Sequence, residues 1–177
     1  LLAVALMFTP LAFAAEGEGA PAPLDWQHWQ AGNEVGNTAS LQRGARNFFG
    51  YCAGCHSLKY VRYSRLATDL RISTDQLKAN LLPAGATPAD YVSSSLAPTD
   101  AVAWFGKVPP DLSLIARSRG TDHISQFLKT FYLDPSRPTR TNNLVLDAAA
   151  LPAVLSELEG VTAAVYRNVE ITVDGKS

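Results

Sequence analysis

Apolar residues recur at helical spacing between residues 41 and 52. They follow one another at intervals of four and three, the period of an amphipathic helix. Asn37, Thr38 or Ser40 is available to cap the start of this helix. The helix would deliver its C-terminal end directly to Cys52, so the first of the two cysteines would be presented from a rigid element.

Two further stretches show the same period. Residues 74–82 form a polar and apolar stretch that Ser73 or Thr74 can cap and Pro83 ends. Residues 122–132 place several bulky apolar side chains on one face. Together with the first stretch they predict a mainly α-helical fold.

The segments between these helices are rich in turn-forming residues. We expect a surface excursion over residues 84–98, a tight turn over 104–110 and a loop over 134–143. Residues 111–117 open another helix, and residues 165–173 alternate enough to form a strand or hairpin arm. The fold class expected is therefore helical with long loops.

Length and charge narrow the class of protein. A chain of 177 residues is long enough for one domain with an apolar core. Its net charge is −1, which gives no support to nucleic acid as the principal partner. No internal repeat accompanies the scattered prolines and glycines.

The N-terminal part of the chain has the composition of a targeting segment. Residues 1–14 are almost all apolar and end in a small-x-small pattern, as in a secretory signal peptide, here a partial one. Residues 15–23 are rich in Gly, Ala and Pro and predict a flexible mature N-terminus. The folded domain is expected over residues 24–177, in an exported protein.

Both cysteines of the chain fall in one motif, Cys52-Ala53-Gly54-Cys55-His56. The spacing C-x-x-C-H is typical of covalent haem c, in which two thiols hold the porphyrin and the adjacent histidine ligates the iron. A redox dithiol does not need the immediate histidine, and a zinc site would have to recruit His28 and His123. We therefore favour haem, with His56 as the proximal ligand.

Several separated motifs, in order, resemble the cytochrome c1 family. The resemblance runs from about Trp26 to the end of the chain. It rests on residues 41–45 (LQRGA), 51–66 (YCAGCHSLKYVRYSRL), 104–106 (WFG), 109–120 (PPDLSLIARSRG) and 131–143 (FYLDPSRPTRTNN).

The resemblance implies a class I cytochrome c-like helical haem domain that carries electrons and performs no independent catalysis. Its electron donor would be a Rieske iron-sulfur protein and its acceptor a soluble cytochrome c, within a quinol-cytochrome c reductase that also contains cytochrome b. It would lie on the periplasmic side of a bacterial inner membrane.

The resemblance also assigns roles to single residues. Cys52 and Cys55 would form the thioethers, His56 the proximal iron bond, and Pro110 would line the proximal side of the haem. Arg117 matches the family arginine near a haem propionate, which agrees with the planar fork that a guanidinium offers a carboxylate. A solvated helix arginine is the alternative.

The sequence departs from the family at the sixth ligand. The family carries a methionine before a proline, whereas this chain reads Leu151-Pro152, and its single methionine is Met7. A leucine cannot ligate iron, so the sixth ligand is left open. His28 and His123 are the remaining imidazoles, and a five-coordinate haem with ligand-binding or peroxidatic activity is the alternative function.

Two further features complete the expectations. The family's C-terminal helix and membrane anchor have no counterpart in this sequence, so we expect a fragment whose membrane association depends on a missing anchor. Lys59, Arg62 and Arg65 alternate with Tyr60 and Tyr63, which indicates either a docking patch or, as we favour, a solvated helix face with aromatic anchoring.

Overall fold

A computed structural model of the chain describes residues 24–166. In this part the fold is mostly helical, with long loops and two small antiparallel sheets, β1-β2 and β3-β4. The helices are η1 (a 3₁₀ turn, Trp26–His28), α1 (Thr38–Tyr51), α2 (Tyr63–Asp69), α3 (Thr74–Asn80), α4 (Pro98–Phe105), α5 (Ile115–Arg119), α6 (Thr121–Lys129) and α7 (Ser156–Glu159). The strands are β1 (Leu58–Arg62), β2 (Tyr91–Val92), β3 (Phe131–Leu133) and β4 (Thr141–Asn143). The expected mainly helical fold is confirmed.

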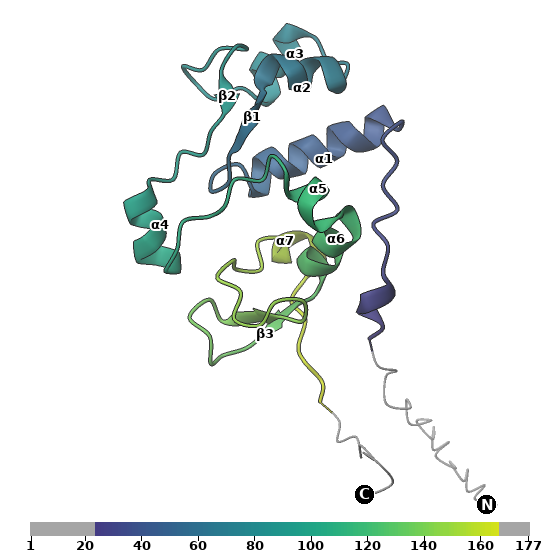
Figure 1. Ribbon diagram of the computed structural model, residues 1–177, viewed down its shortest axis with the longest axis vertical. Coiled ribbons are helices and arrows are strands. Elements are labelled where there is room, and N and C mark those ends of the chain that lie inside the picture. The colour runs from purple at the N-terminus through teal and green to yellow at the C-terminus, as the bar shows by residue number, and fades with distance from the viewer. Residues whose placement is uncertain (1–23, 167–177) are drawn as a thin grey trace, which may run out of the picture.

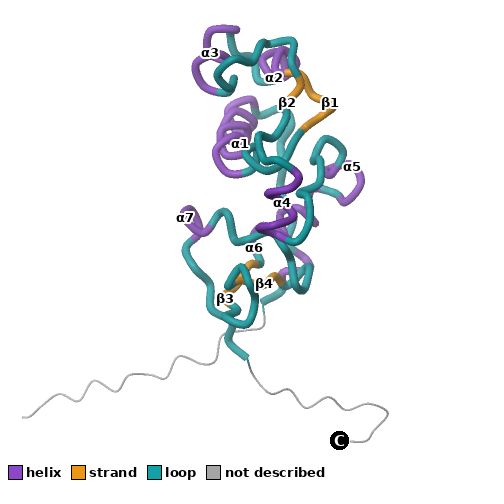
Figure 2. Tube along the Cα trace, turned by 90° about the vertical axis from the view of Figure 1, so that its left-hand side faces the viewer, coloured by secondary structure: helices purple, strands orange, loops and turns teal. Residues whose placement is uncertain are grey.

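The elements gather at two ends of the molecule. Figures 1 and 2 show α2, α3 and the β1-β2 sheet above α1, with α6, α7 and the β3-β4 sheet at the opposite end. α4 projects to one side in Figure 1, and α5 lies next to α6. The turn that follows α1 therefore lies between the two ends.

α1 forms where the periodic pattern predicts it. Asn37 caps the helix, since its side-chain oxygen accepts a hydrogen bond from the backbone N–H of Ser40 at 3.0 Å. The helix runs for 14 residues, and Cys52 is its C-terminal cap. The prediction that a helix presents the first cysteine is thus confirmed.

A small apolar core closes the end that holds α1, α2 and α3. Tyr63, Leu77 and Val92 are each at most 3% exposed and form one cluster. Phe48 and Phe49 of α1 pack against this cluster, and the rings of Phe49 and Tyr63 are 5.9 Å apart. α1 is thereby anchored to the sheet that follows it.

The alternating basic and aromatic run does not form the helix face that we favoured. Leu58–Arg62 is strand β1, and α2 begins at Tyr63, whose ring is buried. These residues form a strand rather than a helix because their backbone pairs with β2 and with the segment after Pro110. Of the two tyrosines in the run, Tyr63 is buried and Tyr60 is exposed, while Arg62 lies 4.0 Å from the ring centroid of Tyr91.

Three loop boundaries also differ from expectation. The excursion over residues 84–98 contains strand β2, and its Val92 is only 1% exposed. α4 occupies residues 98–105, with Pro98 in its first turn and Gly106 in the left-handed conformation (φ 75°) at its end. Residues 141–143 form a strand where a loop was expected.

The remaining helices are close to their predicted places. α3 and α6 begin within one residue of expectation, and α3 carries a capping box in which Ser73 and Gln76 exchange side-chain and backbone hydrogen bonds. α5 begins at Ile115 rather than at Asp111, because Asp111 and Ser113 are bonded to the backbone of β1 instead.

Some expectations concern residues outside this part of the chain. The signal peptide (1–14), the flexible segment (15–23) and most of the strand expected over 165–173 lie outside the described residues. Between residues 24 and 166, no helix combines the length and apolar character needed to cross a bilayer.

Candidate haem-attachment site

The C-x-x-C-H motif forms a compact turn at the end of α1. The N–H of Cys52 still donates to the carbonyl of Phe48, at 2.8 Å, as the last bond of the helix. The carbonyl of Cys52 then accepts from the N–H groups of Cys55, at 3.1 Å, and His56, at 2.8 Å. Both thiols are free and half-buried. The turn thus brings the two thiols and the imidazole together.

His56 is oriented by a backbone carbonyl. Its Nδ1 lies 2.8 Å from the carbonyl oxygen of Pro110, and because a carbonyl only accepts, Nδ1 carries the proton and donates. The lone pair of the neutral ring then resides on Nε2. A second partner that fixes tautomer and ring direction in this way is typical of metal-ligating histidines.

The segment that carries Pro110 is itself held against β1. The N–H of Leu112 donates to the carbonyl of Ser57 at 2.9 Å, and the carboxylate of Asp111 accepts from the N–H of Lys59 at 2.7 Å. The hydroxyl of Ser113 accepts from the N–H of Tyr60 at 3.1 Å. Four hydrogen bonds, including that of His56, therefore join residues 56–60 to residues 110–113.

The pKa of Asp111 reflects its role as a hydrogen-bond acceptor from β1. Partial burial pushes the pKa up, but hydrogen bonds from Ser113 and from the N–H of Lys59 outweigh it and leave the pKa of Asp111 below its ordinary value. The carboxylate is therefore ionised at neutral pH and remains a strong acceptor for the N–H groups of Lys59 and Ser113.

The Cys52 thiol differs from the nucleophile of a redox dithiol. Burial, followed by the neighbouring Cys55, raises the pKa of the Cys52 thiol. Nucleophilic cysteines of C-x-x-C redox motifs instead have lowered pKa values, because the thiolate is the reactive form. The geometry also offers no metal cluster in place of haem, since residues 24–166 contain no group of three or more His, Cys, Asp and Glu side chains able to hold a metal ion.

Arg117 is the predicted site residue that the structure does not join to the others. It lies in α5, seven residues after Pro110, and its side chain is exposed. Its guanidinium makes no hydrogen bond or ion pair with another residue between 24 and 166. Within residues 24–166, no side chain pairs with this cation.

The three candidates for the distal side lie in different places. Leu151 is half-buried in the loop before α7. His28 is exposed and its Nδ1 bonds to Asp25 at 2.5 Å, whereas His123 is half-buried in α6. Neither histidine is hydrogen-bonded to the turn that carries His56.

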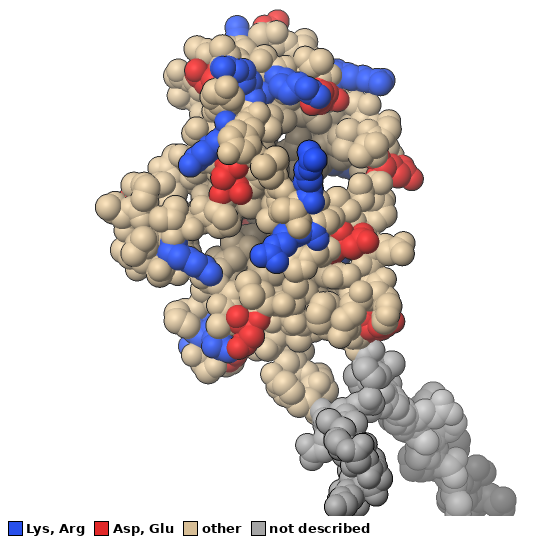
Figure 3. Space-filling view, in the orientation of Figure 1, with Lys and Arg blue, Asp and Glu red and all other residues tan. Residues whose placement is uncertain are grey.

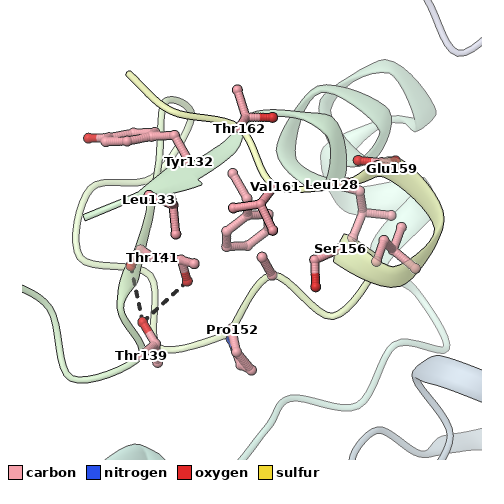
Figure 4. A pocket seen from close by; sticks show the side chains of 14 residues that line it. Leu128, Tyr132, Leu133, Thr139, Thr141, Pro152, Ser156, Glu159, Val161 and Thr162 are labelled. Atoms are coloured by element: carbon pink, nitrogen blue, oxygen red, sulfur yellow. Dashed lines mark hydrogen bonds between the residues drawn. The ribbon is translucent and has the colours of Figure 1, made fainter. Parts of the chain in front are cut away.

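Two pockets in the surface of residues 24–166 are lined by no residue of the motif. One of about 240 Å³ lies between α6, the β3-β4 sheet and the chain around α7, as Figure 4 shows, and its lining includes Pro152 but not Leu151. This is below the roughly 300–1,000 Å³ of most small-molecule sites. The surface is also hollowed at mid-height between α4 and the α5–α6 segment, as Figure 3 shows.

Comparison with known proteins agrees with the motif and its geometry. A family model described as "Cytochrome C1 family" matches residues 26–154. The chain belongs to the cytochrome c1 family. The match spans α1, the C-x-x-C-H turn, the Pro110 segment and the loop that holds Leu151.

Three curated relatives are similar over most of the chain. The cytochrome c1 of Allochromatium vinosum is 44% identical over 90% of this chain and 63% of its own length. The ammonia monooxygenase gamma subunit of Nitrosomonas europaea is 38% identical over 90% of this chain and 65% of its own length. The cytochrome c1 of Rhodospirillum rubrum is 32% identical, over 77% and 58% respectively. The chain thus spans about three fifths of the length of these relatives.

The cofactor of this family is a covalently attached haem c, and the residues of this chain fit it. Two free thiols lie on one turn, and the adjacent imidazole uses Nδ1 for its bond to Pro110, so that Nε2 is the nitrogen available to ligate iron. Covalent haem c requires two thiols for its thioether bonds and an imidazole as a ligand of its iron.

Sequence reasoning missed the residues that hold the turn in place. Asp111 and Ser113 were assigned to a helix, and Ser57 and Ser94 carried no pattern at all. The pair Pro109-Pro110 before Asp111 was the available signal, because an aspartate after prolines often accepts backbone N–H groups in a turn.

Proposed function

We propose that this chain carries electrons through a covalent haem c, as a subunit of a quinol-cytochrome c reductase. The observation that carries the proposal is the hydrogen bond from Nδ1 of His56 to the carbonyl of Pro110 within a C-x-x-C-H turn. It prepares Nε2 as an iron ligand before the metal arrives, which a redox dithiol would not need.

The residue roles proposed are those that the resemblance to the family implies. Cys52 and Cys55 form the two thioethers, and His56 supplies the proximal bond to the iron. Pro110 lies against the proximal side and raises the basicity of the imidazole through its carbonyl. Arg117, which is exposed in α5 and matches the family arginine, pairs with a haem propionate through the planar fork of its guanidinium.

The partners proposed are those of the family's complex. A Rieske iron-sulfur protein gives the electron and a soluble cytochrome c takes it, while cytochrome b belongs to the same complex. The chain works on the periplasmic side of a bacterial inner membrane after export by residues 1–14, with residues 24–177 as its haem domain, and an anchor outside this sequence tethers it. It performs no catalysis of its own.

The test removes both thiols. The variant Cys52→Ala, Cys55→Ala should leave no haem attached to the denatured polypeptide, whereas Ser93→Ala, as a matched control outside the turn, should retain it. The measurement is haem absorbance that stays with the chain after acid and solvent extraction. Covalent haem in the double variant would refute the proposal.

Leu151 favours a second candidate, a five-coordinate haem that binds small ligands. The loop position that the family fills with methionine holds a side chain without a donor atom, and residues 8–177 contain no methionine. Carbon monoxide should then bind rapidly to the reduced protein, and Leu151→Met should slow this binding and raise the reduction potential. A wild-type haem that is low-spin and indifferent to carbon monoxide would exclude this candidate.

A further inference from the structure

The peptide between the two cysteines is held by a residue far away in the sequence. The carbonyl oxygen of Gly54 accepts a hydrogen bond from the hydroxyl of Ser94, at 2.7 Å, across 40 positions of the chain. Ser94 is half-buried in the loop between β2 and α4. This contact lies inside the C-x-x-C spacing itself.

Ser94 is fixed at two further points. Its backbone N–H donates to the hydroxyl of Ser57 at 2.8 Å, and its own hydroxyl accepts from the N–H of Leu96 at 3.0 Å. The hydroxyl thus both accepts and donates, and its direction toward Gly54 is set by the loop that bears it. Together Ser94 and Ser57 bind the loop to the turn before and after His56.

The turn's own backbone hydrogen bonds run from Cys55 and His56 to the carbonyl of Cys52, and they leave the carbonyl of Gly54 without a partner inside the turn. Gly54 is exposed, and the space around its α-carbon is open. A glycine at such a place gives the backbone more freedom than any other residue. On the other side of the turn, Pro110 and Leu112 hold His56 and Ser57, so Gly54 is left to the Ser94 hydroxyl.

We propose that Ser94 is a positioning residue that holds the Cys52–Cys55 turn in the conformation in which both thiols are attached to haem. The inference rests on the proposed attachment at Cys52 and Cys55. Each attachment adds one S–H bond across one vinyl group: the sulfur bonds to the inner carbon, the hydrogen goes to the outer carbon, and no net oxidation or reduction occurs. The two additions require both sulfurs at a fixed separation, which is the separation that the Gly54 peptide determines.

Removing the hydroxyl has a defined consequence. Gly54 loses its partner and the N–H of Leu96 loses its acceptor, so the turn samples other conformations. A hydrogen bond of ordinary net strength changes the ratio of ordered to disordered turn about fivefold. We expect the yield of the second thioether bond to fall most, because this bond must form while the haem is already tethered by the other sulfur.

The experiment compares Ser94→Val with Ser94→Thr in the full chain, expressed with its haem-attachment machinery. Threonine and valine have the same shape, and threonine keeps the hydroxyl. Ser93→Ala and Ser95→Ala are matched controls, because both flanking serines are exposed in the same loop. The measurements are covalent haem per polypeptide and the pyridine haemochrome band, which reports whether one or two vinyl groups have reacted.

Ser94→Val should lose about fivefold in doubly attached haem and gain the band of a single thioether. Ser94→Thr and both controls should match the parent chain. Equal double attachment in the Val and Thr variants would overturn the role of Ser94 while leaving the proposed function intact. Covalent haem that persists in the chain lacking both cysteines would instead overturn the proposed function.

Discussion

The two ends of the molecule are closed by different chemistry. At the α1–α3 end (residues 38–92), the buried side chains are Tyr63, Leu70, Leu77 and Val92, all largely apolar. At the α6–α7 end (residues 121–163), they are Thr130, Asn142, Asn143 and Ala149, of which three are polar. One end therefore resembles an ordinary apolar core, while the other is organised around amide groups.

The two asparagines hold the loop that follows β4. The side-chain oxygen of Asn143 accepts from the N–H groups of Val145 and Leu146, and its nitrogen donates to the carbonyl of Phe127 at 2.7 Å. Asn142 accepts from the N–H of Ala148 at 3.0 Å. It also donates to the carboxylates of Asp134 and Asp147, at 3.1 and 2.8 Å.

The difference between apolar and polar burial shows how each end supports the C-x-x-C-H turn that lies between them. Apolar burial is strong but non-directional, so it fixes α1 and β1 as rigid supports for the turn that carries His56. Hydrogen bonds are directional, so buried amides can fix the course of an irregular loop. The loop that they hold leads to Leu151, the position proposed above to face the distal side of the haem.

Leu77→Ala should have the largest effect and act on the α1–α3 end. The side chain is 1% exposed, and a cavity left by such a truncation costs about 2–5 kcal/mol in the free energy of unfolding. Leu158→Ala is the control, since Leu158 is 56% exposed. Urea unfolding of the haem-loaded protein measures both. A loss as small as that of the control would mean that this end does not depend on its apolar core.

Asn142→Ala should come next and act on the α6–α7 end. The backbone N–H groups of Asn143 and Ala148 would lose their acceptor, and a buried unsatisfied group costs about 1–3 kcal/mol. Asn80→Ala is the control, because that amide is exposed and donates one bond, to Gln76. Hydrogen exchange should increase in residues 142–148 and not in α1. Increased exchange at both ends would show that the two ends unfold as one unit.

Ser73→Ala should have a smaller effect, limited to α3. It removes one half of the capping box and should lower the free energy of unfolding by about 1 kcal/mol. Ser93→Ala serves as the control in a loop. Amide exchange at the start of α3 reports the change, and an unaltered rate there would show that packing of Leu77 alone holds the helix.

Acid should loosen the α6–α7 end with the smallest effect. Hydrogen bonds from Ser136 and from Asn142 chiefly lower the pKa values of Asp134 and Asp147, respectively. A lowered folded-state pKa contributes stability above the ordinary value of 3.8 that is lost as pH falls through the lowered value. Exchange in residues 134–148 should therefore rise below about pH 4, and Asn142→Ala should weaken this dependence. A dependence unchanged in that variant would contradict the role of the amide.

Much of the fold could be predicted from local pattern. α1, α3 and α6 have strong apolar periods, α1 and α3 also have identifiable caps, and each helix lies within a few residues of its expected range. The strand at Leu58–Arg62 could not be predicted, because its basic and aromatic residues fit either a helix face or a strand. Its partners, Val92 and the segment after Pro110, lie more than 30 residues away.

The same limit applies to the site. The motif identified Cys52, Cys55 and His56, since their spacing is a local requirement of haem attachment. Ser94 could not be found this way, because a serine among Ser93, Ser94 and Ser95 has no feature that separates it from its neighbours. Only the contact with Gly54 distinguishes it.

The sequence by itself determined the cofactor chemistry and the helices that present it, because thiol spacing and apolar period are both local properties of the chain. The tertiary structure decided which carbonyl orients His56, which hydroxyl holds Gly54 and which amides fix the loop before Leu151. The physical reason is that each of these hydrogen bonds joins groups whose distance depends on how the whole chain folds, and a directional bond exists only once that distance is set.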